Sequence, residues 1–441
     1  MANVASAAVS DTVRVSEILE NPHGNCALGG VNAALSALNG AVQIYHTGPG
    51  CCMQTTAGEA GQAGGRVPLI SGVQIPCSNM LERDVVLGGI EKLDTHVAGA
   101  IEIIRGDAYF ILTGCTAGII GDDVESLAKR YRDAGHPVYA VQSAGFLGES
   151  YHGYEIAVKA LLDSIVETEP REKRQDLVNV LGILPYHDPF WEGNFEEIRR
   201  LLGKLGLEAN TFFGQDEGVN AVRSSSRAAL NIVLSPWLLK DAMEEYKSRF
   251  AIPALRFPFV PVGAADTAAF LRGVGKALGR EAQAEQAIAE EERYFYHYLE
   301  SAIGVQSWKR YAVVGESANV AGLTRFLANE YSFAPEVSIV TDPVPVGEDR
   351  EYLAAALRDL DYAKPPEVVF TGDQWEINQA LSRFPELSLV VGSTNEREYA
   401  TQRNIQFLVA SYPNTERLIF NRAIAGYRGA LAFLEDLYSN T

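Results

Sequence analysis

The stretch YFILTGCTAGIIGDDVESLAKRYRDAG, residues 109–135, contains one complete strand, turn and helix. The apolar run at 109–114 is short and nearly continuous, which predicts a strand buried on both faces of a parallel sheet. The run at 122–135 spaces its apolar residues along one face and therefore predicts an amphipathic helix. Cys115 lies between the two. We expect its side chain at the carboxyl end of the strand, where parallel sheets place their ligands.

The same alternation of strand and helix runs through the rest of the chain. Apolar segments predict further strands at 41–46, 178–184, 228–235, 310–315, 337–341, 367–372 and 387–392. Amphipathic segments predict helices at 195–206, 321–331 and 375–384. Alternation of this kind is typical of doubly wound α/β folds.

Two changes in composition predict domain boundaries. One is the charged run from Glu167 to Arg174, and the other is an acidic, alanine-rich helix from Gly279 to Ser307. A chain of 441 residues also exceeds what one hydrophobic core usually organises. We therefore expect three Rossmann-like α/β domains with parallel sheets, at residues 1–166, 167–300 and 301–441.

Composition and charge exclude several classes of function. Hydrophobic residues make up 47% of the chain and charged residues 21%, as in folded proteins. No basic N-terminal region precedes an apolar run, and no uncharged apolar run approaches the roughly 20 residues that span a bilayer. We expect a cytoplasmic protein without membrane contact. A net charge of −19 disfavours nucleic acid as a partner. No phosphate-binding glycine loop is found, so we expect nucleotide chemistry on a partner.

All five cysteines lie within the first 115 residues, at Cys26, Cys51, Cys52, Cys77 and Cys115. An odd number without a signal peptide argues against a disulfide framework and for metal binding or burial. Cys26, Cys51 and Cys115 lie beside glycines that can offer free N–H groups to sulfur. Iron–sulfur clusters require soft thiolate ligands with hydrogen bonds to sulfur. These three residues are therefore candidate cluster ligands.

The residues alone leave two other interpretations of the cysteines open. Free cysteine often fills space in a core, and we expect Cys77 to be buried and inert. A zinc site could be built from His23, Cys26 and the Cys51/Cys52 pair, but this set lacks the usual paired spacing.

Four motifs resemble, in order and spacing, the first domain of nitrogenase component 1 subunits and their relatives: CALGG at 26–30, HTGPGCC at 46–52, VVLGG at 85–89 and GCTAGIIGDDV at 114–124. The resemblance continues at 178–209, 313–327, 372–381, 390–396 and 425–437. In that family, cysteines at the places of Cys26, Cys51 and Cys115 bind the P-cluster, an [8Fe-7S] electron relay shared across the interface of two subunit types. The resemblance implies that these three residues are its ligands in this chain.

The resemblance also implies which subunit type this is. The α-type subunit of the family holds the catalytic cofactor through a further cysteine and a histidine beyond the first domain, and this chain has no cysteine after Cys115. A β-type subunit in an α2β2 heterotetramer is implied, with no catalytic residue of its own. An ATP-dependent iron–sulfur reductase would dock transiently. Leu87 matches a position where the family exposes an apolar side chain to that reductase, although a core leucine fits the sequence equally well.

One departure from the family pattern concerns the substrate. Molybdenum enzymes that reduce dinitrogen have a serine just before a Phe-x-Gly sequence, and here Gly145 stands at that place, with Ser143 two residues earlier. This resembles the nitrogenase-like reductases, and among them we expect a methylthio-alkane reductase, which cleaves C–S bonds of small methylthio compounds. The alternatives are the β subunit of a dinitrogen-reducing nitrogenase, a scaffold subunit for nitrogenase cofactor maturation, and a plain α/β binding protein with inert thiols.

Local patterns give expectations for a few polar residues. His46 either donates to a cluster sulfur or packs beneath the cysteine turn. Asp122 and Asp123 are predicted to cap the helix that follows them. Ser317 or Asn319 is predicted to cap the helix after the strand at 310–315.

Overall fold

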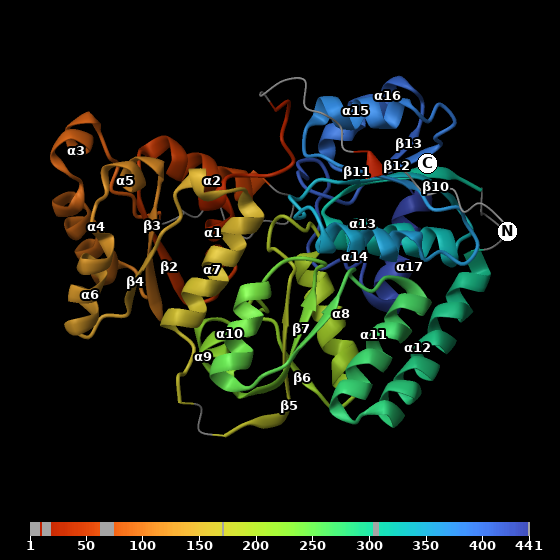
Figure 1. Cartoon of the computed structure of the whole chain (residues 1–441), viewed down its shortest axis with the longest axis horizontal. Helices are drawn as coiled ribbons and strands as arrows, with labels where there is room; N and C mark the ends of the chain where they lie inside the picture. The colour runs from red at the N-terminus through yellow and green to blue at the C-terminus, as the bar shows by residue number, and fades with distance from the viewer. Residues whose placement is uncertain (1–8, 11–18, 62–74, 170–171, 303–307, 440–441) are drawn as a thin grey trace.

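A computed structural model describes residues 9–10, 19–61, 75–169, 172–302 and 308–439. Its described strands form three separate sheets, and every strand pair is parallel (Figure 1). The predicted fold class, α/β with three parallel-sheet units, is therefore confirmed. The domain limits at residues 166 and 300 stay a proposal, and Ser307 and residues 170–171 lie outside the described residues.

The first sheet has the order β2-β3-β4, the second β6-β5-β7-β8 and the third β1-β11-β10-β9-β12-β13. Their strands are β2 (Ala41–His46), β3 (Ala108–Thr113) and β4 (Val138–Val141); β5 (Arg174–Leu181), β6 (Glu208–Asn210), β7 (Ala228–Leu234) and β8 (Ala254–Phe257); and β1 (Val9–Ser10), β9 (Arg310–Gly315), β10 (Ala334–Val340), β11 (Glu367–Phe370), β12 (Leu389–Gly392) and β13 (Gln406–Val409). Strand β1 pairs with β11, so residues close to the N-terminus belong to the third sheet.

All eight strands predicted from apolar runs are present, and five further strands were not predicted. The five are β1, β4, β6, β8 and β13, and each lies at the edge of its sheet. An edge strand has only one strand neighbour and is shorter and less buried, so its residues need not form a continuous apolar run.

Helices cover the sheets on both faces (Figure 1). In chain order they are α1 (Ala27–Ser36), α2 (Pro49–Gly61), α3 (Glu82–Leu87), α4 (Ile90–Ile103), α5 (Cys115–Ile120), α6 (Val124–Asp133), α7 (Ser150–Ser164), α8 (Trp191–Lys204), α9 (Val219–Ser224), α10 (Lys240–Phe250), α11 (Gly263–Leu278), α12 (Glu281–Ala302), α13 (Ser317–Asn329), α14 (Glu348–Arg358), α15 (Gln374–Ser382), α16 (Arg397–Gln402) and α17 (Gly426–Ser439). The helices predicted from sequence correspond to α6, α8, α12, α13 and α15. Within the described ranges, no helix is both long and apolar enough to cross a bilayer.

The helix after β9 begins with a different cap from the one predicted. Glu316, rather than Ser317 or Asn319, is the N-cap of α13, and its carboxylate accepts hydrogen bonds from the Ala318 and Asn319 N–H groups at 3.0 and 2.5 Å. The prediction of a serine or asparagine cap was therefore wrong. A carboxylate one residue earlier satisfies the same free N–H groups of the first helical turn.

Two glycines let α1 and α7 cross in close contact. A Cβ at Gly30 would lie 1.8 Å from the carbonyl oxygen of Ser150, and one at Gly153 would lie 2.2 Å from that of Ala27. Any larger residue would force the helices apart. The second glycine of the CALGG motif thus serves helix packing.

Candidate functional site

The crossing of α1 and α7 fixes the position of Cys26. Cys26 is the N-cap of α1 and bridges to Glu149, immediately before α7. The N–H of Ala27 donates to the carbonyl oxygen of Gly148 at 2.8 Å, and that of Ser150 donates to the carbonyl oxygen of Asn25 at 2.8 Å. Cys26 is therefore held at the start of two helices, and its side chain is exposed.

Cys26 and Cys115 converge on a third residue, Gly145. Cys115 is the first residue of α5, directly beyond the carboxyl end of β3, as predicted. A Cβ built at Gly145 would lie 3.1 Å from the sulfur of Cys115 and 3.1 Å from the sulfur of Cys26. Two thiols that are 89 positions apart in the sequence thus lie on either side of a residue that has no side chain. The space between them is open only because residue 145 is glycine.

Cys51 and Cys52 lie on the first turn of α2, which begins at Pro49. The side chain of Cys51 is exposed, whereas Cys52 is buried. Adjacent helical residues point about 100° apart, so the two thiols face different surroundings.

The zinc alternative does not fit the position of His23. Its Nε2 lies 2.7 Å from Oε1 of Gln374 and 3.1 Å from Oε1 of Glu396, both in the third domain. His23 is therefore committed to a buried contact between domains rather than to the cysteines. Across the residues that the structure describes, no cluster of three or more His, Cys, Asp or Glu side chains could hold a metal ion by itself.

The IIGDD sequence places two adjacent aspartates in different roles. Gly121 ends α5 with a positive φ of 74°, a conformation that glycine adopts without strain. After that turn, Asp123 caps α6 by accepting a hydrogen bond from the N–H of Ser126 at 3.1 Å, as predicted. Hydrogen bonds from the hydroxyl and the N–H of Ser126 lower the pKa of the Asp123 carboxyl. Asp122 does not cap the helix, so that part of the prediction was wrong.

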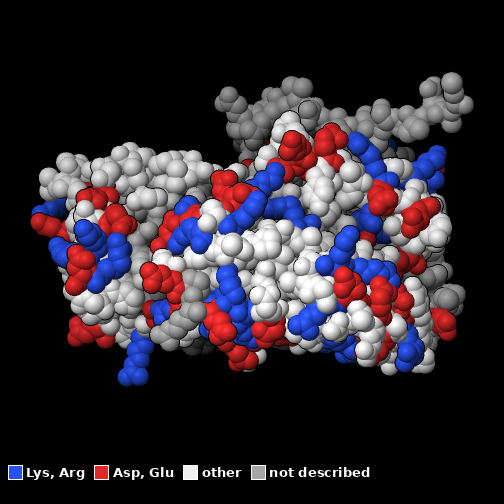
Figure 2. Space-filling model, turned by 60° about the horizontal axis from the view of Figure 1, so that its bottom comes forward, with Lys and Arg blue, Asp and Glu red and all other residues white. Residues whose placement is uncertain are grey.

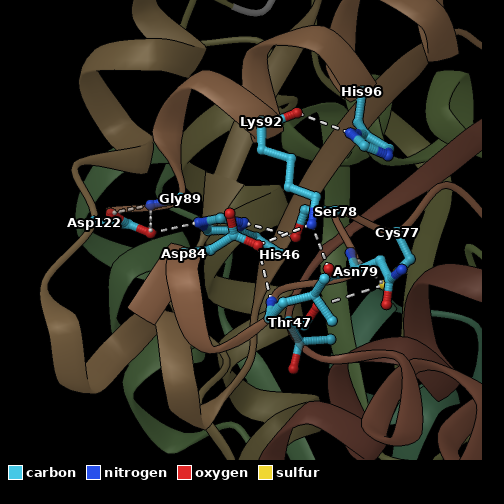
Figure 3. A network of polar contacts seen from close by, with 11 residues as sticks. His46, Thr47, Cys77, Ser78, Asn79, Asp84, Gly89, Lys92, His96 and Asp122 are labelled. Atoms are coloured by element: carbon cyan, nitrogen blue, oxygen red, sulfur yellow. Dashed lines mark hydrogen bonds and ion pairs between the residues drawn. The ribbon is translucent and has the colours of Figure 1, made fainter. Parts of the chain in front are cut away.

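Asp122 instead holds His46 and the second glycine of VVLGG (Figure 3). Its Oδ2 lies 2.8 Å from Nε2 of His46, and both carboxylate oxygens accept from the N–H of Gly89 at 3.1 Å. Nδ1 of His46 lies 2.9 Å from the hydroxyl of Ser78. A carboxylate can only accept, so Nε2 carries the proton and Nδ1 accepts from Ser78. Both ring nitrogens are occupied, and His46 packs under the cysteine segment rather than donating to a cluster sulfur.

Burial lowers the pKa of His46, and the hydrogen bond to Asp122 opposes that effect. A fully buried imidazole with a lowered pKa is neutral at pH 7. The network therefore orients the backbone that precedes Cys51 without placing a positive charge there.

Cys52 and Cys77 influence each other electrostatically although 25 positions separate them in the sequence. Interaction with Cys52 lowers the pKa of Cys77 to about 7, and interaction with Cys77 raises the pKa of Cys52. Cys77 is half-buried, so the prediction that it is buried was wrong, and its inertness stays a prediction. No spacing rule links the two positions, because the fold brings them near each other.

Ser143, the nearest hydroxyl to the family's serine position, is fully buried beneath the loop. Its hydroxyl donates to the carbonyl oxygen of Thr113 at 3.0 Å, and its N–H donates to the Thr113 hydroxyl at 3.0 Å. Ser143 therefore fixes the loop between β4 and α7 to the end of β3, on which Cys115 follows.

Exposed apolar side chains lie on the cysteine-bearing helices α2 and α5, beside Gly145, and at α3, which contacts α5, and we call this set the apolar rim. It comprises Met53 on α2, Leu81, Val85, Val86 and Leu87 at α3, Ile119 on α5, and Phe146 and Leu147 beside Gly145. Leu87 is 72% exposed, which excludes the core-leucine interpretation. Exposed apolar residues gathered in one region mark an interaction surface.

Charged side chains are mixed on the face shown in Figure 2. Lysine and arginine alternate with aspartate and glutamate there, without a continuous basic area. A phosphate backbone needs such an area. The expectation that nucleic acid is not a partner stays a prediction.

Three carboxylates meet where the second and third sheets end: Asp188 and Asp342, which are buried, and Glu316, which is half-buried. The hydrogen bonds they accept come from neutral donors, as when Asp342 accepts from the Ser317 N–H at 2.7 Å and the Trp237 indole at 2.6 Å. Burial raises the pKa of Asp188 to about 6. Burial, together with repulsion from Asp342 and Asp188, raises the pKa of Glu316 well above its usual range.

Comparison with known proteins places this geometry in a family. A family model described as nitrogenase component 1 type oxidoreductase matches residues 26–441, from the first candidate cysteine to the end of the chain. The chain belongs to this family. Family membership makes it a relative of oxidoreductases whose members bind iron–sulfur clusters.

Individual relatives fall into two groups. The chain is 23% identical to the vanadium–iron nitrogenase β chain of Trichormus variabilis over 95% of its length and 93% of that protein. It is 24% identical to the iron–iron nitrogenase β chain of Rhodobacter capsulatus, over 98% and 95%. It is 28% identical to the cofactor biosynthesis protein NifE of Methanococcus maripaludis over 58% of its length, and this match spans about half, 52%, of NifE.

A solved structure of a nitrogenase, Cp1 at pH 6.5, has the same fold. It superposes with a TM-score of 0.79 at 19% identity and covers 97% of this chain and 94% of its own. At this identity the likeness concerns the fold alone.

Proposed function

We propose that this chain is the β-type, electron-relay subunit of a nitrogenase-like reductase, with Cys26, Cys51 and Cys115 as ligands of an [8Fe-7S] P-cluster. The observation that carries the proposal is the convergence of the Cys26 and Cys115 sulfurs on either side of Gly145. Cys51 supplies the third thiolate from the exposed first turn of α2. Such a cluster stores and passes single electrons.

The β-type assignment rests on the distribution of cysteine. No cysteine follows Cys115, so the second and third domains have no thiolate for a catalytic cofactor. The near-full-length matches to proteins named as nitrogenase β chains support the same assignment.

The surroundings of the thiols support a cluster that is shared with a partner subunit. Three thiolates are too few for eight irons, and Cys26 and Cys51 are exposed. The apolar rim around them offers a surface for an α-type subunit that would complete the ligand set and exclude water. The assembly we propose is an α2β2 heterotetramer.

An ATP-dependent iron–sulfur reductase would deliver the electrons. Leu87, the exposed last residue of α3, is the side chain that we assign to that contact. Transient electron-transfer partners use small surfaces, and one exposed apolar helix end suits that size.

For the reaction, we propose reductive C–S cleavage of methylthio-alkanes in the α-type subunit. It would consume two electrons and two protons and release a hydrocarbon and methanethiol. This part rests on Gly145 standing where molybdenum enzymes have serine. The relatives quoted above are named for nitrogenases and cofactor biosynthesis, so dinitrogen reduction is the competing reaction.

A scaffold subunit for cofactor maturation is the second candidate function. The matches to NifE, named for iron–molybdenum cofactor biosynthesis, favour it over the residues they cover. A scaffold would bind clusters without turnover.

The first test is anaerobic purification of the chain with its co-purifying partner, followed by quantitation of iron and sulfide. Wild type should contain both, Cys115→Ala should lose most of both, and the control Cys77→Ala should retain them. Iron near zero in an intact wild-type complex would refute the cluster. Assays with the reductase and ATP then separate the candidate functions. Methanethiol from a methylthio-alkane would indicate C–S cleavage, and ammonia from dinitrogen would indicate a nitrogenase. No turnover would indicate a maturation scaffold.

A further inference from the structure

Strand β4 is the last strand of the first sheet, and its free edge opens into a groove. Within the described residues it pairs with β3 alone. Helix α6 packs on one face of this sheet and α7 on the other, and α10 lies against α7 (Figure 1). A cavity of about 860 Å³ runs between these three helices along β4. None of the proposed cluster ligands lines it, so what binds here is independent of the proposed function.

The backbone groups of Ala140 face this groove without a strand partner. The N–H of Tyr109 donates to the carbonyl oxygen of Pro137 at 2.8 Å, which fixes the register of β3 and β4. Alternate residues of an edge strand bond to the neighbouring strand, and the residues between them point their N–H and C=O groups outward. This register places Ala140 among the outward-facing residues. Two residues earlier the edge is closed, because the guanidinium of Arg132 donates to the carbonyl oxygen of Val138 at 2.9 Å.

The opposite edge of the same sheet is already covered. The N–H of Tyr45 on β2 donates to the carbonyl oxygen of Pro76, and the N–H of Ser78 donates to that of Tyr45, both at 2.8 Å. Residues 76–78 thus lie along the outer edge of β2 as an added strand would. An unpaired strand edge is a template for pairing with another chain, and in the described part of this sheet β4 offers that template.

The walls of the groove carry unpaired negative charge. Their charged residues are two cations, Arg132 and Lys159, and four carboxylates, Glu125, Glu155, Asp163 and Asp241. Each cation is already paired with a carboxylate of the groove, at 2.6 Å for Arg132 and 2.7 Å for Lys159. No basic residue of the described chain forms an ion pair with the other two carboxylates, Glu155 and Asp241.

Glu155 on α7 is the carboxylate best placed to receive a cation from a partner. It is half-buried, and its Oε1 accepts from the N–H of Leu239 at 2.8 Å, which leaves Oε2 for another donor. Arg256 influences the pKa of Glu155, but this guanidinium donates to the carbonyl oxygens of Ser235 and Leu238 instead. Burial raises the pKa of the Glu155 carboxyl, and a cation beside it would offset this cost of ionisation.

We propose that this groove binds an extended, lysine- or arginine-bearing segment of a partner protein, which adds to β4 as a further strand. Side chains of a strand alternate in direction, so every second one would face α7 and α10. There Ile156 and Ala160 suit the alkyl stem of a lysine or arginine, and the free carboxylates suit its charge. Main-chain pairing supplies affinity, and the side chains supply selectivity. The net charge of −19 on this chain disfavours a second copy as the occupant.

The test measures the binding of labelled hexapeptides to the purified full chain by fluorescence anisotropy. The probe is Lys-Val repeated three times and blocked at both ends, since valine favours strands. A Glu-Val hexapeptide reverses the charge, and a third peptide keeps the Lys-Val sequence but has N-methyl groups on its backbone nitrogens. The Lys-Val peptide should bind, and both others should bind at least tenfold more weakly. No binding of the Lys-Val peptide, or equal binding of its N-methylated form, would overturn the proposal.

Variants of the chain locate the binding. Ala140→Pro removes the outward N–H of β4, leaves the pairing with β3 intact and should abolish binding; if it fails to fold, the N-methylated peptide tests the same contact on wild type. Glu155→Gln keeps the acceptor for the Leu239 N–H and should weaken binding about fivefold. The matched control, Glu300→Gln on α12, removes an exposed carboxylate outside the groove and should bind as wild type does.

Two results with these variants would contradict the proposal. One is undiminished binding to a folded Ala140→Pro, or equal affinities of Glu155→Gln and Glu300→Gln. The other is self-association of the full chain in sedimentation that Ala140→Pro abolishes, which would assign the edge of β4 to a second copy of the chain.

Discussion

Replacing Gly145 with alanine places a methyl group between the two sulfurs that we propose as cluster ligands. The new Cβ would lie 3.1 Å from each sulfur and 3.2 Å from Cβ of Cys26. Optimal contacts between such atoms are about 3.5 to 4.0 Å, so each sulfur has to move outward by about 0.5 Å. Metal sites tolerate about 0.2 Å of error in their ligand distances.

The energetic cost follows from this shortage of space. Overpacking by one methyl group typically costs about 1 to 3 kcal/mol, and since 1.4 kcal/mol is about tenfold in an equilibrium constant, the cluster should bind about 5- to 150-fold more weakly. A tightly held cluster can survive such a loss at equilibrium. We therefore expect the clearest effect in the rate at which iron passes to a chelator.

The assay compares iron and sulfide content, and the rate of iron release to bipyridyl, in the anaerobic complex. Gly145→Ala should contain less iron and release it faster than wild type. The matched control is Gly99→Ala on α4, where an added Cβ meets no atom within 4 Å. Thermal unfolding of the metal-free chains shows whether each variant keeps its fold. Wild-type iron content and release rate in a folded Gly145→Ala would refute the argument that the cluster occupies the space between these sulfurs.

Two further predictions concern stability. Asp122→Ala leaves a buried histidine and a backbone N–H without their partner. It should lower the free energy of unfolding by about 2 to 4 kcal/mol in urea titrations, whereas Asp123→Ala, which removes only a helix cap, should cost about 1 kcal/mol. Equal losses would contradict the assigned roles. Burial raises the pKa of Asp188 from 3.8 to about 6 in the folded state, so the protonated carboxyl favours the folded state below about pH 4 and this contribution is lost as the pH rises through 6. Wild type should therefore lose about 3 kcal/mol of unfolding free energy relative to Asp188→Asn between pH 4 and pH 7, and parallel stability curves would show that Asp188 does not titrate in this way.

The strands that the sequence predicts are those that contain a run of consecutive apolar residues. The sequence at β3 is apolar along all six residues, and every one of them is buried. Edge strands such as β8 and β13 are only partly buried, and polar residues interrupt them. Their pairing is decided by the strand beside them, so a reading of local sequence cannot find them.

The helix caps show a similar limit. A carboxylate next to a helix start is a cap candidate in any sequence, and both Asp122 and Asp123 met that description. Gly121 decides between them, because its positive φ turns the chain so that only Asp123 remains at the helix N-terminus. Asp122 then points toward His46, which is 76 positions away in the sequence.

The cysteines show the same difference between what local sequence predicts and what depends on tertiary structure. Cys115 could be placed from sequence because the end of a buried parallel strand fixes the direction in which the next residue points. The convergence of its sulfur with that of Cys26 depends on the crossing of α1 and α7, and this in turn depends on Gly30 and Gly153. Neither glycine touches a thiol. A substitution at Gly153 should therefore disturb the proposed cluster site through the position of α1, although no ligand is changed. Gly30 and Gly153 thus determine the position of Cys26 without contacting it, and only the folded structure shows this connection.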